Sequence, residues 1–169
     1  MVLHVVVSWT LFIYYTNLYF YLRSGEIIFM ASVKRVELHD TIWKDYRGWG
    51  VNPIESAGIS RESLGNIHIV SIRPGAIRGN HYHTNATEWI LICGGSARIA
   101  WRTLKEKSIH EVVVNEADPA LFEIQPNIEH AVLNDSDRDI YLISFSNSYE
   151  RCTVSSSSLF EAIERNRFC

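Results

Sequence analysis

The most informative stretch of this chain is GAIRGNHYHTNATEWILICGG, residues 75–95. His81 and His83 are two residues apart, so on a β-strand their imidazoles point to the same side of the sheet. Glu88 follows a short polar segment that can turn the chain, and it precedes an apolar run, residues 89–93, typical of a buried strand. We therefore expect a hairpin that brings two imidazoles and a carboxylate together.

A fourth candidate ligand, His130, lies downstream. It comes after the turn-forming pair Pro126-Asn127 and opens an alternating strand. Three imidazoles and one carboxylate form a ligand set that Zn, Fe, Mn, Ni, Co and Cu all accept, and zinc is our first expectation. The set leaves coordination positions open to water or substrate. The sequence thus predicts one divalent metal ion held by His81, His83, Glu88 and His130.

This spacing resembles the two sequence motifs of the cupin superfamily, small jelly-roll β-barrels whose interior usually holds a divalent metal. The matching positions are Gly75-x5-His81-x-His83-x4-Glu88-x6-Gly95 for the first motif and His130-x3-Asn134 for the second. The first motif is filled at all five positions. The second departs from the family pattern in its loop, where Gly, Pro and Gly are usual and the chain has Pro119, Gln125 and Asn127. The resemblance covers residues 67–146.

The resemblance implies an all-β fold, a single-domain cupin jelly-roll β-barrel with a short C-terminal helix. The chain itself favours a barrel or sandwich, because short strand-like segments recur between turn signals without a helical period. These segments are 33–38, 67–73, 89–93, 97–102, 109–115, 120–124 and 140–146. We expect a turn at 45–50, a loop at 54–64 and a helix at 157–165, where a serine can cap its start.

We expect four segments along the chain. They are an apolar extension at 1–29, an N-terminal edge strand with loops at 30–62, the cupin barrel at 63–148, and a tail with a short helix at 149–169. Residues 1–22 carry no charged side chain except histidine and are long enough to cross a bilayer, but they lack a positively charged start. Two interpretations of 1–29 stay open: a membrane anchor, or sequence outside the native protein with translation beginning at Met30. Gly25-Glu26 implies purine-rich codons, as in a ribosome-binding site, shortly before Met30.

Charge and composition limit the partners. The net charge is −3, and the basic residues are scattered, so we expect no nucleic-acid partner. We expect a small-molecule substrate, a homodimer because barrels of this kind have open sheet edges, and a cytoplasmic location. A membrane is expected as a partner only if residues 1–22 are part of the native protein.

A second resemblance concerns the reaction. Arg78-Gly79-Asn80-His81-Tyr82 is similar to the Arg-Gly-x-His-Tyr segment of dTDP-4-keto-6-deoxyhexose 3,5-epimerase-like proteins. The longer segment 74–88 is closer to the cupin domain of bifunctional capsular-polysaccharide epimerase/reductases, although no reductase fingerprint G-x-x-G-x-x-G occurs in the chain. These resemblances imply a keto-sugar nucleotide as substrate, Arg78 as a substrate contact, and proton transfer beside a metal-polarised ketone.

The two resemblances give His81 competing roles. In the epimerases this histidine is the base, whereas a metal ligand has no lone pair left to accept a proton. We favour the ligand, because His83 and Glu88 have no purpose in a metal-free site. The general base is then unplaced, with three candidates: Tyr141, Tyr149 and Glu129. His4, His39, His68 and His110 are interpreted as surface or core residues.

Two other functions stay open at this point. Cupins also include metal-dependent dioxygenases, in which a redox metal binds oxygen. The chain could instead be a non-catalytic cupin that binds a small ligand, because fold and ligands do not determine function. Whether the protein is an enzyme is therefore left open, and an enzyme is expected to be a sugar-nucleotide epimerase or isomerase.

Overall fold

The computed structural model describes residues 14–15, 18–23, 26–29, 32–36, 38, 41–117, 119–149 and 152–167. The chain forms two compact units, Met1–Ala31 and Ser32–Cys169. The first unit contains three antiparallel strands, β1 (Tyr14–Tyr15), β2 (Leu18–Arg23) and β3 (Glu26–Phe29). Much of the segment 1–29 lies outside the described residues, so its two interpretations stay predictions. Within the described ranges, no helix is long and apolar enough to cross a membrane.

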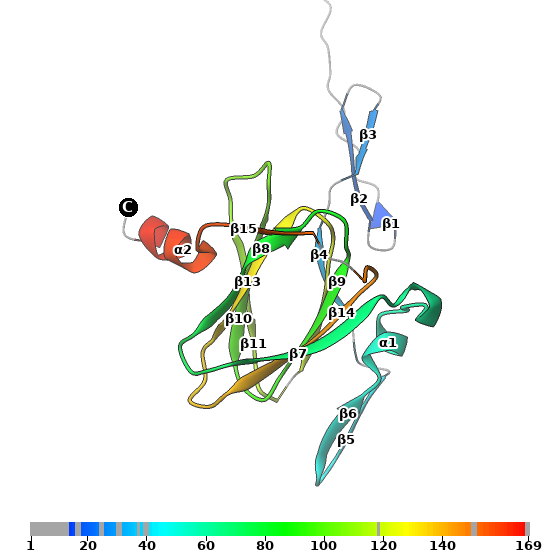
Figure 1. Ribbon diagram of the computed structural model, residues 1–169, viewed down its shortest axis with the longest axis vertical. Helices are drawn as coiled ribbons and strands as arrows, with labels where there is room; N and C mark the ends of the chain where they lie inside the picture. Colours follow the sequence, from blue (N-terminus) through cyan, green and yellow to red (C-terminus); the bar gives the residue numbers. More distant parts are fainter. Residues whose placement is uncertain are drawn as a thin grey trace, which may run out of the picture. The chain divides into compact units, whose positions relative to one another are not determined.

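Two antiparallel five-stranded sheets form the second unit (Figure 1). The first has the order β11-β10-β13-β8-β15 and consists of β8 (Ile77–His83), β10 (Ala97–Thr103), β11 (His110–Val114), β13 (Ile128–Asn134) and β15 (Thr153–Ser155). The second has the order β4-β12-β9-β14-β7 and consists of β4 (Val33–Val36), β7 (Asn66–Ile72), β9 (Glu88–Cys93), β12 (Ala120–Ile124) and β14 (Ile140–Ser146). Figure 1 shows the two sheets as opposite walls of a barrel. The predicted all-β jelly-roll fold is confirmed.

Strand β9 is buried on both faces, which explains its unbroken apolar sequence. Its outward side chains Trp89 and Leu91 join a core cluster with Leu121 and Phe145 of the neighbouring strands. Its alternate side chains, including Ile90, face the barrel interior and are equally buried. A strand with two buried faces shows no apolar-polar alternation. Glu88, the first residue of this strand, is therefore placed at the interior by the same alternation that buries Ile90.

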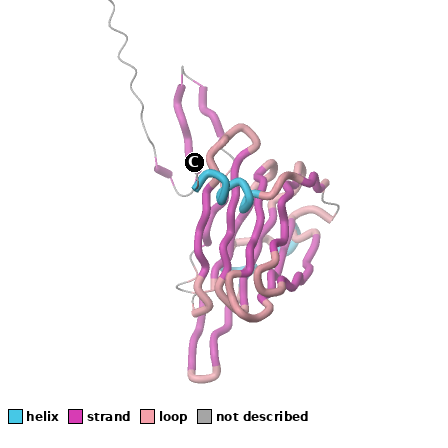
Figure 2. The backbone as a smooth tube through the Cα atoms, turned by 90° about the vertical axis from the view of Figure 1, so that its left-hand side faces the viewer, coloured by secondary structure: helices cyan, strands magenta, loops and turns pink. Residues whose placement is uncertain are grey.

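Each sheet is covered on its outer face. Leu38 and residues 41–64 pack on the second sheet, where Leu38 and Ile59 belong to the same cluster as Trp89. Helix α2 (Leu159–Arg167) packs on the first sheet, where its residues Leu159 and Phe160 meet small side chains of β10 and β13 (Figure 2). The predicted C-terminal helix is thus confirmed, beginning two residues later than expected.

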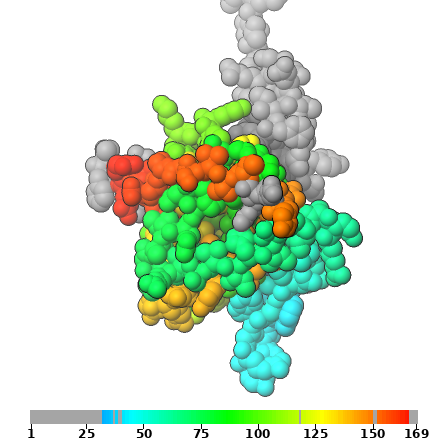
Figure 3. Space-filling model, in the orientation of Figure 1, coloured from blue at the N-terminus to red at the C-terminus, as the bar shows by residue number. Residues whose placement is uncertain are grey.

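Two sequence predictions between residues 41 and 64 are wrong in part. The expected turn at 45–50 is a hairpin of β5 (Ile42–Asp45) and β6 (Gly48–Val51), which projects from the barrel surface (Figure 3). Its two-residue turn is stabilised by Asp45, whose carboxylate accepts the backbone N–H of Arg47 at 2.8 Å. The expected loop at 54–64 contains α1 (Pro53–Ser56) and a 3-10 helix (Arg61–Ser63). The start of α1 carries two known signals, an Asn52 cap and a proline at the first helical position.

Candidate metal centre

Three strands bring the four predicted ligands together inside the barrel. His81 and His83 come from β8, Glu88 from the start of β9, and His130 from the facing position on β13, where it pairs in register with His81. One ligand atom from each of the four side chains lies within 4.8 Å of all the others. Glu88, His83 and His130 are almost completely buried, and His81 is half-buried. The hairpin expected from residues 75–95 therefore forms, and β13 supplies the fourth side chain.

An irregularity in β8 turns its histidines into this position. Gly79 and Asn80 both have positive φ, 98° and 55°, and the register between β8 and β13 shifts at this point. A side chain at Gly79 would place its Cβ 2.7 Å from the His130 carbonyl oxygen and 2.9 Å from the Ala131 Cα. Only glycine permits this approach of the two backbones. The Asn80 side chain accepts a hydrogen bond from the backbone N–H of Leu159 at 3.1 Å, which ties the bulge to α2.

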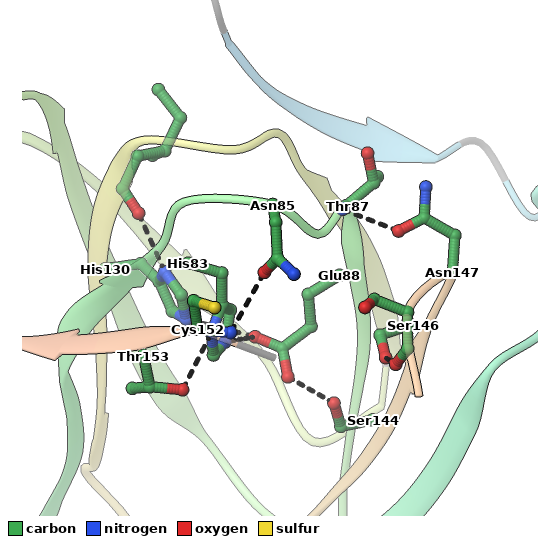
Figure 4. Close-up of polar contacts among 12 residues, drawn as sticks. His83, Asn85, Thr87, Glu88, His130, Ser144, Ser146, Asn147, Cys152 and Thr153 are labelled. Atoms are coloured by element: carbon green, nitrogen blue, oxygen red, sulfur yellow. Dashed lines mark hydrogen bonds and ion pairs between the residues drawn. The ribbon is translucent and has the colours of Figure 1, made fainter. Parts of the chain in front are cut away.

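Hydrogen bonds orient two of the imidazoles. His130 Nδ1 lies 3.0 Å from the carbonyl oxygen of Ile128, which can only accept, so Nδ1 carries a proton and Nε2 is the nitrogen that faces Glu88. His83 Nδ1 lies 3.0 Å from the hydroxyl of Thr153 on β15 (Figure 4). Both Nε2 atoms point at Glu88. Partners of this kind are typical of metal-binding histidines, because they fix the ring orientation and the tautomer.

Glu88 lies at the centre of this arrangement. Its Oε2 is 3.2 Å from Nε2 of both His83 and His130, and its Oε1 accepts a hydrogen bond from the Ser144 hydroxyl (Figure 4). Burial alone would raise the pKa of this carboxyl group, but the hydrogen bonds from His130, His83 and Ser144 outweigh burial and hold the pKa well below its usual range. Glu88 is therefore an anion in the barrel interior.

The donor set fits a first-row divalent cation. At bond lengths of about 2.0–2.2 Å, neighbouring ligand atoms of a five- or six-coordinate metal lie roughly 3 Å apart. The two separations of 3.2 Å between Glu88 and the histidines agree with that geometry. One anionic oxygen and three neutral nitrogens compensate part of a divalent charge and leave room for a further ligand.

A pocket of about 420 Å³ opens beside the four side chains. It lies between the two sheets, with apolar walls that include Val70, Ile90 and Leu142. Arg78 lines it and is exposed, so its guanidinium group reaches both the pocket and solvent. A concave pocket in which apolar walls meet convergent polar groups is the usual form of a small-molecule site.

The three candidate bases lie outside the lining of this pocket. Tyr141 and Tyr149 are 47% and 81% exposed. Glu129 is buried and forms an ion pair with Arg102. Tyr141 alternates with the inward residues of β14, and Glu129 with the inward His130 of β13, so strand alternation directs both side chains away from the interior.

Sequence reasoning missed three polar residues of the pocket. Ser144 and Thr153 hydrogen-bond to the predicted ligands Glu88 and His83, and both line the pocket. His68, interpreted from the sequence as a surface or core residue, also lines it. The alternation of residues along β7 could have indicated that His68 points inward. The sequence did not indicate which strands would lie beside and opposite β7.

Comparisons with known proteins agree with this structure. Residues 44–153 match the family model described as the polysaccharide biosynthesis C-terminal domain. The chain is 28% identical over 103 residues to UDP-2-acetamido-2,6-beta-L-arabino-hexul-4-ose reductase of Pseudomonas aeruginosa, a match that covers 61% of this chain and 26% of that protein. The chain thus spans about a quarter of its curated relative.

Solved structures share the fold. The capsular polysaccharide assembling protein CapF of Staphylococcus aureus superposes with a TM-score of 0.52 and 23% identity, over 56% of this chain and 27% of CapF. The dTDP-6-deoxy-D-glucose-3,5-epimerase RmlC of Legionella pneumophila, solved with dTDP-4-keto-L-rhamnose, superposes with a TM-score of 0.58 and 13% identity, over 76% and 79% of the two chains. The resemblance to capsular-polysaccharide enzymes and to the 3,5-epimerases that the sequence indicated is thereby confirmed at the level of fold.

Proposed function

The chain belongs to the polysaccharide biosynthesis C-terminal domain family, and from that premise we propose that it is a metal-dependent carbohydrate-modifying enzyme. Its substrate is a nucleotide-linked keto-sugar, and its reaction is an epimerisation or isomerisation by proton transfer beside the ketone. One observation carries the proposal. Four side chains that can each offer one ligand atom to a metal converge within 4.8 Å at the side of a pocket of about 420 Å³ that an arginine also lines.

The metal ligands in this proposal are His81, His83, Glu88 and His130. A divalent cation, zinc in our first expectation, would act there as a Lewis acid that polarises a ketone and makes the neighbouring C–H acidic. Thr153 and Ile128 hold His83 and His130 in the orientation that this requires. Ser144 holds Glu88 from the opposite side.

The proposed role of Arg78 is to bind the diphosphate. The residue lines the pocket from β8 and is exposed, so it can contact a ligand that extends from the pocket into solvent. A guanidinium group forms paired hydrogen bonds with phosphate oxygens and stays protonated at every relevant pH. The sugar would then occupy the pocket, whose lining combines apolar and polar side chains, with the nucleotide outside.

Metal content tests the ligand assignment. We expect near-stoichiometric metal in the purified full chain by inductively coupled plasma mass spectrometry, and loss of that metal in His83→Ala and in His130→Ala. His110→Ala is the matched control, because His110 is exposed on β11 and lies outside the group of four. Wild-type protein that stays metal-free after reconstitution with zinc, iron and manganese would contradict the assignment.

Proton exchange tests the reaction. In D2O, the metal-loaded protein is expected to exchange hydrogen at carbon beside the ketone of UDP-2-acetamido-2,6-beta-L-arabino-hexul-4-ose or dTDP-4-keto-L-rhamnose, followed by NMR. Oxygen uptake with iron or copper bound and without exchange would favour the dioxygenase alternative. Tight binding of either sugar nucleotide without exchange would favour a non-catalytic binding protein. The cytoplasmic location stays a prediction.

A further inference from the structure

His68 occupies a position that the sequence did not indicate. It lies on β7, in the sheet opposite β8, and pairs in register with Ser144 of β14. Its neighbours Ile67 and Ile69 are 54% and 68% exposed, whereas His68 and Val70 line the pocket. Strand alternation therefore directs the imidazole into the space between the two sheets.

The residues that line the pocket limit which side chain could act as the general base. Among its described residues, six can carry or exchange a proton on a titratable side chain: His68, Arg78, His81, His83, Glu88 and His130. Four of these form the group whose ligand atoms lie within 4.8 Å of one another, and a ligand's lone pair is occupied by the metal. Arg78 remains protonated and cannot accept a proton. His68 is the remaining group, and it lies outside that set of four.

We propose that His68 is the base that removes the proton from the carbon beside the ketone, an assignment that rests on the function proposed above. The C–H bond breaks, its proton goes to the imidazole of His68, and its electron pair forms a carbon–carbon double bond while the ketone oxygen takes the negative charge. The charge then returns to carbon, which takes up a proton again. Return from His68 restores the same configuration, and return from water on the opposite face gives the epimer.

The position of His68 is suited to this step. The metal ligands come mainly from β8 and β13 of one sheet, and His68 comes from the other sheet, so a sugar ring in the pocket would lie between the polarising cation and the base. His68 is thus a catalytic residue in this proposal and not a positioning residue.

The first test compares exchange rates at saturating substrate. In D2O, the full chain loaded with zinc is given each of the two keto-sugar nucleotides named above. We expect His68→Gln to keep its metal and its affinity for dTDP, measured by calorimetry, while kcat for exchange falls by about 100-fold or more. His110→Gln, the matched control on an exposed strand position, should exchange at the wild-type rate.

The outcomes separate this inference from the proposed function. Exchange by His68→Gln at close to the wild-type kcat, with only KM raised, would overturn the assignment and leave the function standing, because His68 would then only bind the sugar. Wild-type protein that exchanges neither compound would overturn the function, and the assignment with it.

A second test does not depend on turnover. In the metal-free protein, the Cε1–H signal of His68 is identified by NMR as the one missing from His68→Gln. Addition of dTDP-4-keto-L-rhamnose should shift this signal and leave that of His110 in place. An unchanged His68 signal at saturating ligand would show that the imidazole does not reach the sugar and would overturn the proposal.

Discussion

At the scale of single residues, the proposed metal centre depends on a backbone approach at Gly79. We expect Gly79→Ala to lose more stability than Gly75→Ala, although both positions have positive φ, 98° and 71°. The left-handed backbone costs about 1–2 kcal/mol in either variant. A Cβ at Gly75 would meet only open space, whereas a Cβ at Gly79 would meet the backbone of β13, which adds roughly 1–3 kcal/mol. Urea denaturation measures the difference, and equal losses would contradict the role of the close approach.

The hydroxyl of Thr153 is the second residue-scale feature. In Thr153→Val the side chain keeps its shape but can no longer form a hydrogen bond with Nδ1 of His83, so we expect metal affinity to fall by about 10- to 100-fold. Thr153→Ser keeps the hydroxyl and is expected to bind metal like wild type. Competition with a chromophoric chelator measures the dissociation constants. Wild-type affinity in Thr153→Val would mean that the contact does not orient the ligand.

At the scale of elements, α2 is held to the barrel by a few side chains. Leu159 is fully buried against Ala100 and Ala131, and its backbone N–H donates to Asn80 in the β8 bulge. We expect Leu159→Ala to lower the free energy of unfolding by about 2–5 kcal/mol. Glu161→Ala, an exposed position on the same helix, should change it by less than about 0.5 kcal/mol.

Chemical denaturation followed by circular dichroism compares the two helix variants. Because α2 anchors Asn80, we also expect Leu159→Ala to weaken metal binding, which Glu161→Ala should not do. A helix that contributes only its own packing would lower stability without changing the metal affinity. That result would show that the packing of α2 does not affect metal binding.

At the scale of the whole molecule, the edges of the sheets differ in how they are protected. Edge strand β4 carries Lys34 and Arg35, and edge strand β15 has only three residues. Strand β7 has seven residues, is paired on one side among the described strands, and exposes Ile67 and Ile69. A long edge with exposed apolar side chains is suited to pairing with another chain. We therefore expect the predicted homodimer to form by pairing of β7 with β7 of a second copy of the chain.

Light scattering after size exclusion tests this assignment. We expect wild-type protein to have twice the mass of the chain and Ile69→Lys to be a monomer, because the lysine places like charges opposite each other at a two-fold interface. Val113→Lys is the control, since Val113 is 57% exposed on another edge strand, β11. A dimeric Ile69→Lys, or a monomeric Val113→Lys, would place the interface elsewhere.

The features that could be predicted from the sequence are those with a signal in residues close together along the chain. The spacing of His81 and His83 predicts a shared face on any β-strand, and the polar residues after His83 predict the hairpin that returns Glu88. The two missed elements before residue 64 had local signals as well, in Asn52-Pro53 and in the sequence around Asp45. Those signals are weaker than alternation, because single turns and caps contribute only about 0.5–2 kcal/mol each.

Local sequence was enough to predict the all-β barrel class and the hairpin of His81, His83 and Glu88, because alternation and turn residues act over a few positions of the chain. His130 was joined to these three by the resemblance to the second cupin motif. The residues that surround those four became known only from the folded arrangement. Thr153 lies 70 positions from His83 and Ser144 lies 56 from Glu88, and they meet because β15 pairs with β8 and β14 with β9. His68 enters the pocket for the same reason. Strand pairing and register depend on how all the apolar faces are buried together, which no single stretch of the sequence contains.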